Sequence, residues 1–221
     1  MPATQEKGYK GLPMTGFLAR WYAKNTGKDL EQFRKEAQGV AAQVPSGSHV
    51  LEVAPGPGYF AVELAKLGTY HIVGLDISQT FVRIASDNAK RAGVEVEFRQ
   101  GNASSMPFDS GSFDFIYCRA AFKNFSEPIQ AIHEMHRVLK PRGTAVIVDL
   151  RKDASGSDIN AAVEEMGLDR INSVLTKLIF KHSLLKRAYS QEEFRRMASQ
   201  TPFATCAIKA ASIGMEVSLH K

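Results

Sequence analysis

Short, nearly continuous hydrophobic runs alternate with longer amphipathic stretches through the middle of the chain. Such runs predict buried strands, and they cover residues 49–54, 71–76, 94–100, 113–118 and 144–150. Helical spacing of apolar residues lies between them, over residues 59–67, 78–91 and 127–139. Gly68 and Gly93 are expected to end two of these helices. The alternation predicts a doubly wound α/β fold, because apolar parallel strands need helices on both faces of their sheet.

Outside this region the pattern changes at both ends. Apolar residues near the N-terminus predict two short helices, interrupted at residues 25–27. Two more strands are expected at 205–210 and 215–220, which gives a mostly parallel seven-stranded sheet with an antiparallel C-terminal strand. We expect one domain over 1–221 with four parts: a helical N-terminal lid (1–45), a core (46–150), a helical cap inserted before the last two strands (151–190), and a closing helix and strand pair (191–221).

Composition narrows the function classes. The chain has 221 residues, of which 44% are hydrophobic and 23% charged, so it can bury a core and is not a disordered protein. Its 28 basic and 23 acidic residues give a net charge of +5, and the basic residues look scattered except toward the C-terminus, so a nucleic-acid partner is not expected. Two cysteines cannot form a disulfide framework or a four-ligand zinc site, and no metal is expected. Without a signal peptide or membrane-spanning run, we expect a cytoplasmic protein.

The most informative segment is LEVAPGPGYF, residues 51–60. It places Gly56 and Gly58 at a turn between a strand and a helix, where glycine lets a ligand approach the backbone closely. Asp76 ends the next strand, a position that suits a carboxylate accepting hydrogen bonds from a ribose diol. The spacing Gly56-x-Gly58-x-x-Ala61 also fits the dinucleotide fingerprint, so the turn alone leaves an NAD-dependent enzyme open.

Five segments in order resemble the class I S-adenosylmethionine (SAM)-dependent methyltransferases, most closely the small-molecule, ubiquinone/menaquinone-type branch. They are EVAPGPG (52–58), GLDIS (74–78), GNASSMPF (101–108), SFDFIYCRAAF (112–122) and HRVLKPRGTAVIVD (136–149). The resemblance implies a Rossmann-like fold, SAM as cofactor and a small-molecule methyl acceptor. Ala54 stands where the family has its first glycine, and Asn102 stands where it often has an aspartate that binds the adenine amino group. An asparagine carbonyl oxygen can still accept that hydrogen bond.

The resemblance also implies which residues of the core (46–150) contact the cofactor. The expected contacts are Glu52, Ala54, Pro55, Gly56, Gly58, Asp76, Ile77, Asn102, Ala103, Cys118 and Arg119. A carboxylate inside an apolar strand is costly, so Glu52 either lies near the methionine end of the cofactor or is a structural acid bonded to backbone amides. Cys118 is expected to be a small buried thiol rather than a nucleophile.

Residues on the acceptor side are less clearly marked. Lys123 and Asn124 stand where relatives frequently carry histidines, and with Tyr22 they are candidates for positioning the acceptor. Lys123 is either a base or anion-binding group, or a solvated surface lysine. Trp21 is expected to pack onto the sheet. The basic residues Lys177, Lys181, Lys186, Arg187, Arg195 and Arg196 form either a solvated helix face or a surface for RNA or a membrane.

The sequence therefore predicts methyl transfer from SAM to an O, N, S or C nucleophile of a small molecule by in-line displacement. A nucleic-acid methyltransferase is a weaker alternative, because the Asn/Asp-Pro-Pro-aromatic segment of adenine-modifying enzymes is replaced by CRAAFKN. A SAM-binding protein without turnover stays open. An NAD-dependent oxidoreductase does not account for residues 101–108 and 136–149. The sequence does not indicate the oligomeric state.

Overall fold

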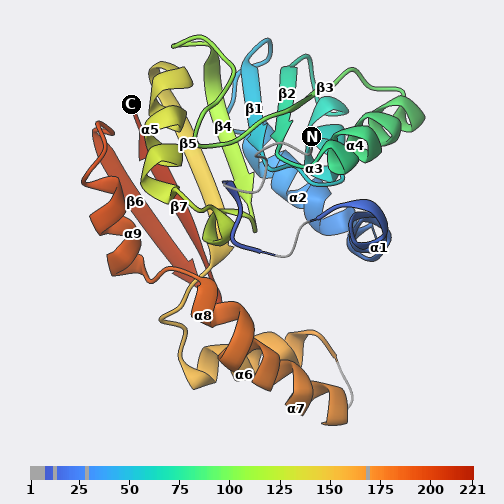
Figure 1. Ribbon diagram of the computed structural model, residues 1–221, viewed down its shortest axis with the longest axis vertical. Coiled ribbons are helices and arrows are strands. Elements are labelled where there is room, and N and C mark those ends of the chain that lie inside the picture. Colours follow the sequence, from blue (N-terminus) through green and yellow to red (C-terminus); the bar gives the residue numbers. More distant parts are fainter. Residues whose placement is uncertain (1–7, 12–13, 28–29, 168–169) are drawn as a thin grey trace, which may run out of the picture.

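The computed structural model describes residues 8–11, 14–27, 30–167 and 170–221. A seven-stranded sheet with strand order β3-β2-β1-β4-β5-β7-β6 forms its centre (Figure 1). The strands are β1 (His49–Val53), β2 (His71–Asp76), β3 (Glu97–Gln100), β4 (Phe113–Arg119), β5 (Leu139–Leu150), β6 (Thr205–Ala211) and β7 (Gly214–His220). Strands β1 to β5 pair in parallel, whereas β7 pairs antiparallel with both β5 and β6. The predicted doubly wound fold and its antiparallel C-terminal strand are confirmed.

Helices cover both faces of the sheet because successive strand residues point to opposite sides. On one face, α2 (Leu30–Ala41) and α3 (Tyr59–Ala65) pack in a cluster that includes Val50 and Phe60. On the other face, α5 (Pro128–Val138) and α9 (Gln191–Ala198) pack in a cluster that includes Leu51 and Phe194. Helix α4 (Gln79–Ala92) follows β2, and the 3-10 turn η2 (Phe122–Asn124) follows β4.

Several of the expected boundaries are wrong. Strand β5 begins at Leu139 rather than at residue 144, because Leu139 pairs with Phe113 of β4. Helix α3 ends at Ala65 with Lys66 as its C-cap, so Gly68 does not end it; Leu67 instead closes a turn back to the carbonyl of Leu64. Strand β3 begins at Glu97 rather than at residue 94, because it pairs with β2 only from Val73 onward. Gly93 does end α4, with a left-handed φ of 68° that favours glycine.

The two outer segments are helical, as expected. Helix α1 (Gly16–Thr26) precedes α2 in the lid. Between β5 and α9 the chain forms α6 (Gly156–Glu165), α7 (Arg170–Ile179), the π-helical turn η3 (Phe180–Leu184) and α8 (Leu185–Arg187). We call α6 to α8 the arm, because Figure 1 shows these helices projecting from the sheet. The arm has a small hydrophobic cluster of its own, made of Ile159, Val163, Phe180 and Leu185.

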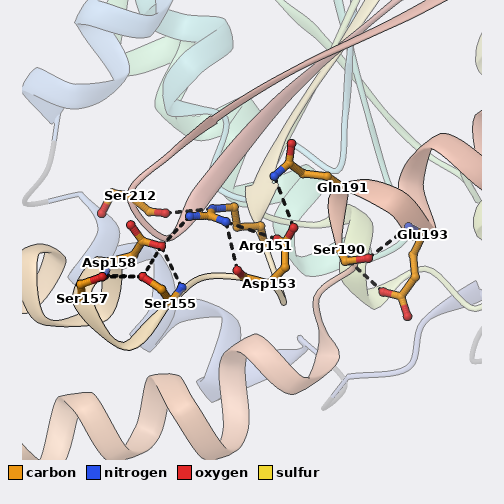
Figure 2. Close-up of polar contacts among 9 residues, drawn as sticks. All are labelled: Arg151, Asp153, Ser155, Ser157, Asp158, Ser190, Gln191, Glu193 and Ser212. Carbon is orange, nitrogen blue, oxygen red and sulfur yellow. Dashed lines mark hydrogen bonds and ion pairs between the residues drawn. The ribbon is translucent and has the colours of Figure 1, made fainter.

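A polar network fastens the base of the arm (Figure 2). The guanidinium of Arg151 pairs with Asp158 of α6 at 2.6 Å and donates to the carbonyl oxygen of Ser212 in the β6–β7 turn at 2.9 Å. The capping box formed by Ser155 and Asp158 begins α6, and a second box formed by Ser190 and Glu193 begins α9. Both connections of the arm are therefore held at defined positions.

Candidate functional site

The predicted cofactor residues meet at the carboxyl ends of β1, β2 and β4. The strand register aligns Val53 with Leu75 on one side and with Cys118 on the other. The turn after β1, Asp76 at the end of β2, and Arg119 at the end of β4 therefore lie along one edge of the sheet. The strand order reverses between β1 and β4, and open α/β sheets bind ligands at such a switch point.

The glycine turn adopts left-handed backbone angles at three positions. The φ angles are 57° at Ala54, 54° at Gly56 and 76° at Gly58. A Cβ on Gly58 would lie only 2.8 Å from the Cβ of Ala85, so close packing against α4 requires this glycine. Pro55 is buried beneath the turn. Gly56 leaves open space where a side chain would be, except for the ring of Tyr22 at 4.0 Å.

Asp76 braces this turn and keeps capacity for a ligand. One carboxylate oxygen accepts from the backbone N–H of Gly56 at 3.0 Å, and the other accepts from the N–H of Ser78 at 2.8 Å. A carboxylate has about four acceptor positions, so two more donors can bind. Burial raises the pKa of Asp76 to about 6, against the lowering effect of these two backbone hydrogen bonds. Its chemistry fits the two hydroxyls of a ribose.

Glu52 is a buried acid with one hydrogen bond, which it accepts from the N–H of Ala61 in α3 at 3.2 Å. Burial raises the pKa of Glu52 to about 8. Within the described part of the chain, no basic side chain forms an ion pair with it. The N–H of Ala61 is the kind of backbone partner that the structural alternative expects, and a place near the methionine end of the cofactor stays a prediction. Because no basic side chain of the described residues is paired with Glu52, a positively charged ligand such as a sulfonium can bind beside it and stabilise its ionised form.

The end of β4 is tied to helix α2. The side chain of Arg119 pairs with Glu36 at 2.8 Å and lies 4.9 Å from the centre of the Phe33 ring. Glu36 also accepts from the hydroxyl of Tyr117 at 3.1 Å. Cys118 is fully buried, as expected of a small buried thiol, and burial raises its pKa well above the ordinary value.

Lys123 is neither solvated nor free. Its ammonium pairs with Asp149 of β5 at 2.7 Å and donates to the carbonyl oxygen of Ala120 at 2.7 Å. Only 11% of the lysine side chain and 4% of the aspartate side chain are exposed, so the surface-lysine alternative is wrong. The backbone N–H of Lys123 donates to the same carboxylate at 2.9 Å. Sequence reasoning missed Asp149, although it is an acid near the end of an apolar strand, as Glu52 is.

Residues 8–11 lie across the expected adenine side. A Cβ on Gly8 would come within 2.7 Å of the Ile77 side chain and within 2.8 Å of the Asn102 side chain. The side-chain oxygen Oδ1 of Asn102 accepts a hydrogen bond from the backbone N–H of Ser104 at 2.9 Å. The second lone pair of this oxygen is left for a ligand. Ala103 packs against the main core. The carbonyl oxygen of Asn124 accepts from the N–H of Lys10 at 2.8 Å, so the same N-terminal segment reaches the acceptor side.

Tyr22 lies nearer to the cofactor turn than to the acceptor side. Its ring contacts Phe81 edge-on at 5.9 Å and faces Gly56. Burial raises the pKa of Tyr22, so the phenol stays protonated at neutral pH.

Two hollows of about 580 and 640 Å³ lie elsewhere on the molecule. They are lined by residues such as His71, Glu97 and Lys90, and none of the predicted site residues lines them. The predicted site residues therefore lie outside both hollows, with Tyr22 of α1 beside the glycine turn.

Comparison with known proteins agrees with this arrangement. Residues 51–147 match a family model described as a methyltransferase domain. Residues 51–147 are therefore similar to known methyltransferase domains, and the fold is that of SAM-dependent methyltransferases of known structure. The matched region includes the glycine turn, Asp76 and the whole of β4.

Similar proteins extend over different shares of the chain. The demethylmenaquinone methyltransferase of Deinococcus radiodurans is 34% identical over 123 residues, which are 55% of this chain and 51% of that protein. The uncharacterized methyltransferase YcgJ of Bacillus subtilis is 37% identical over 133 residues, covering 55% and 52%. The chain thus spans about half the length of these curated relatives. A putative SAM-dependent methyltransferase of Methanococcus maripaludis has the same fold, with a TM-score of 0.73, 20% identity and coverage of 96% of this chain and 97% of that one.

Proposed function

We propose that the protein transfers the methyl group of SAM to a small-molecule acceptor by in-line displacement. The observation that carries this proposal is Asp76, a buried carboxylate braced by Gly56 and Ser78 with acceptor capacity left for a ribose diol. Bound SAM supplies an activated methyl group: the acceptor lone pair forms the new bond to carbon, and the sulfur keeps the electrons of the broken C–S bond.

The chain's residues bind and orient the reactants. Asp76 holds the ribose, while Ile77, Asn102 and Ala103 line the adenine side. Glu52 is mostly protonated at neutral pH in the free protein, and a bound sulfonium lowers its pKa so that the carboxylate forms beside the cation. The ring of Tyr22 covers the glycine turn where water would otherwise enter. Cys118 and Arg119 close the methionine side. Lys123 and Asn124 position the acceptor through η2, with Lys123 acting as the partner that fixes Asp149.

Titration calorimetry with SAM and with S-adenosylhomocysteine tests the cofactor. Wild-type protein should bind both, and Asp76→Ala should bind them more weakly by about 1–3 kcal/mol, because hydrogen bonds to a charged group are lost. Asp87→Ala is the matched control, since Asp87 is an exposed acid on α4. Absence of binding by folded wild-type protein would reject the proposal.

Turnover is tested separately, by release of S-adenosylhomocysteine with thiols, amines and phenols as acceptors. Reduced quinones are included because a relative is a demethylmenaquinone methyltransferase. Binding of SAM without release for any acceptor class would instead favour a SAM-binding protein without turnover. Methylation of RNA but of no small molecule would favour the nucleic-acid alternative.

A further inference from the structure

Helix α7 exposes three large apolar side chains to solvent. The side chains of Val174, Leu175 and Leu178 are 60%, 54% and 50% exposed. Its partly covered positions include the polar residues Ser173 and Thr176. An amphipathic helix that only had to pack against α6 would bury its apolar residues and expose the polar ones. The apolar face of α7 therefore has no partner among the described residues.

Helix α1 repeats this arrangement in another part of the chain. Phe17 and Trp21, one turn apart, are 82% and 55% exposed, whereas Ala19 and Ala23 form the buried face. The expectation that Trp21 packs onto the sheet is therefore wrong, because the small alanines allow α1 to lie close to its neighbours and leave the large rings outside. A tryptophan beside basic residues is typical of helices at the membrane interface.

Positive charge is concentrated in the same two segments. Residues 8–27 and 170–187 contain no acid and eight basic residues, namely Lys10, Arg20, Lys24, Arg170, Lys177, Lys181, Lys186 and Arg187. Taking these eight from the 28 basic residues leaves 20 against 23 acids, so the remainder of the chain is net negative. These two segments therefore combine an excess of positive charge with exposed apolar residues, and the N-terminal one adds to the basic region expected toward the C-terminus.

Both segments lie at the carboxyl end of the parallel strands (Figure 1). The hydroxyl of Ser78, just after β2, donates to the carbonyl oxygen of Met14, which fixes the start of α1 there. Arg151 follows β5 directly and holds the base of the arm. The exposed apolar residues of α1 and α7 thus belong to the side of the molecule that carries the candidate site.

We propose that α1 and the α7–α8 part of the arm bind the surface of an anionic lipid bilayer. The five exposed apolar side chains insert at headgroup level, and the basic residues beside them contact lipid phosphates. Among the described residues, no helix is long and apolar enough to cross a membrane. A nucleic acid would use the positive charge but not the apolar faces, and a second copy would bring like charges together. The proposal does not depend on methyl transfer.

Vesicle flotation tests the binding of α1 and the arm to lipid. One set of vesicles contains phosphatidylcholine alone, and the other contains added phosphatidylglycerol. The protein should float with the anionic vesicles, and the fluorescence of Trp21, its one tryptophan, should shift to shorter wavelength. Leu175→Glu/Leu178→Glu and Lys181→Glu/Lys186→Glu should each reduce the bound fraction by roughly tenfold. Leu67→Glu and Lys209→Glu are matched exposed controls outside both segments, and should bind as wild type does. SAM titration should be the same for every variant, which separates this proposal from the proposed function.

Three results would overturn the docking proposal. The first is absence of flotation with anionic vesicles. The second is binding to RNA that the Leu175→Glu/Leu178→Glu variant retains in full. The third is a dimer, seen by analytical ultracentrifugation without lipid, that the same variant dissociates.

Discussion

The acids of the cofactor side and of the acceptor side are held in opposite ways. Among the described residues, Glu52 and Asp76 accept hydrogen bonds from backbone amides, whereas Asp149 on the acceptor side is paired with the ammonium of Lys123. On the cofactor side, Asp76 keeps acceptor capacity for a ligand, and Glu52, with its pKa raised to about 8, ionises when a cation lies beside it. The acceptor side is neutralised within the protein, so recognition of the acceptor depends on shape and on hydrogen bonds that this pair leaves unused.

Breaking the acceptor-side pair should have the largest effect. Lys123→Ala leaves the buried carboxylate of Asp149 without its partner, which should lower the free energy of unfolding by about 3–5 kcal/mol. Urea denaturation measures this. Lys140→Ala is the control: it breaks a pair with Asp114 in which both side chains are more than a third exposed, and it should cost less than about 1 kcal/mol. Equal losses in the two variants would contradict the buried pairing.

Removing the charge of Glu52 should change how stability depends on pH. Because burial raises its pKa from 4.5 to about 8, its contribution to stability is complete below pH 4.5 and is lost as the pH rises through about 8. Glu52→Gln should lack this loss and be about 2–3 kcal/mol more stable than wild type near pH 9. Thermal denaturation across pH measures the difference, and parallel pH curves for the two proteins would contradict it.

The ionisation of Asp76 should control cofactor affinity. Its pKa is raised to about 6, and only the ionised carboxylate accepts both ribose hydroxyls. Affinity for SAM should therefore rise roughly tenfold from about pH 5 to about pH 7. Calorimetry should show that Asp76→Asn removes this rise and that Asp87→Asn preserves it. A rise retained in Asp76→Asn would assign the titration to another group.

The smallest effect is expected at the glycine turn. Ala54 has a φ of 57°, which costs an L-residue about 1–2 kcal/mol, while glycine loses about 0.5–1 kcal/mol in unfolded-state entropy. Ala54→Gly should therefore stabilise the protein by up to about 1 kcal/mol, a rise of about 2–4 °C in the melting temperature. Ala161→Gly, at an exposed interior position of α6, should lower it. A lower melting temperature for Ala54→Gly would show that the turn holds alanine without strain.

The sequence predicts the cofactor side better than the acceptor side, for a physical reason. The turn after β1 and Asp76 are local features, since glycine at positive φ and an acid at a strand end leave a signal within a few residues. The pairing of Lys123 with Asp149 joins residues 26 positions apart, and no local pattern marks it. The exposure of Trp21 likewise depends on how closely α1 approaches the neighbouring elements. The spacing of apolar residues within α1 does not predict that distance.

The two ends of the arm also lie side by side. Arg151 forms a parallel bridge with Tyr189, and the N–H of Lys152 donates to the carbonyl oxygen of Tyr189 at 3.1 Å. The intervening residues thus leave the sheet and return to it at one place, so the segment behaves as a cassette that a short turn could replace. Evolution can lengthen, recharge or exchange such a cassette without altering the strand order, which lets one cofactor-binding sheet serve in different cellular surroundings.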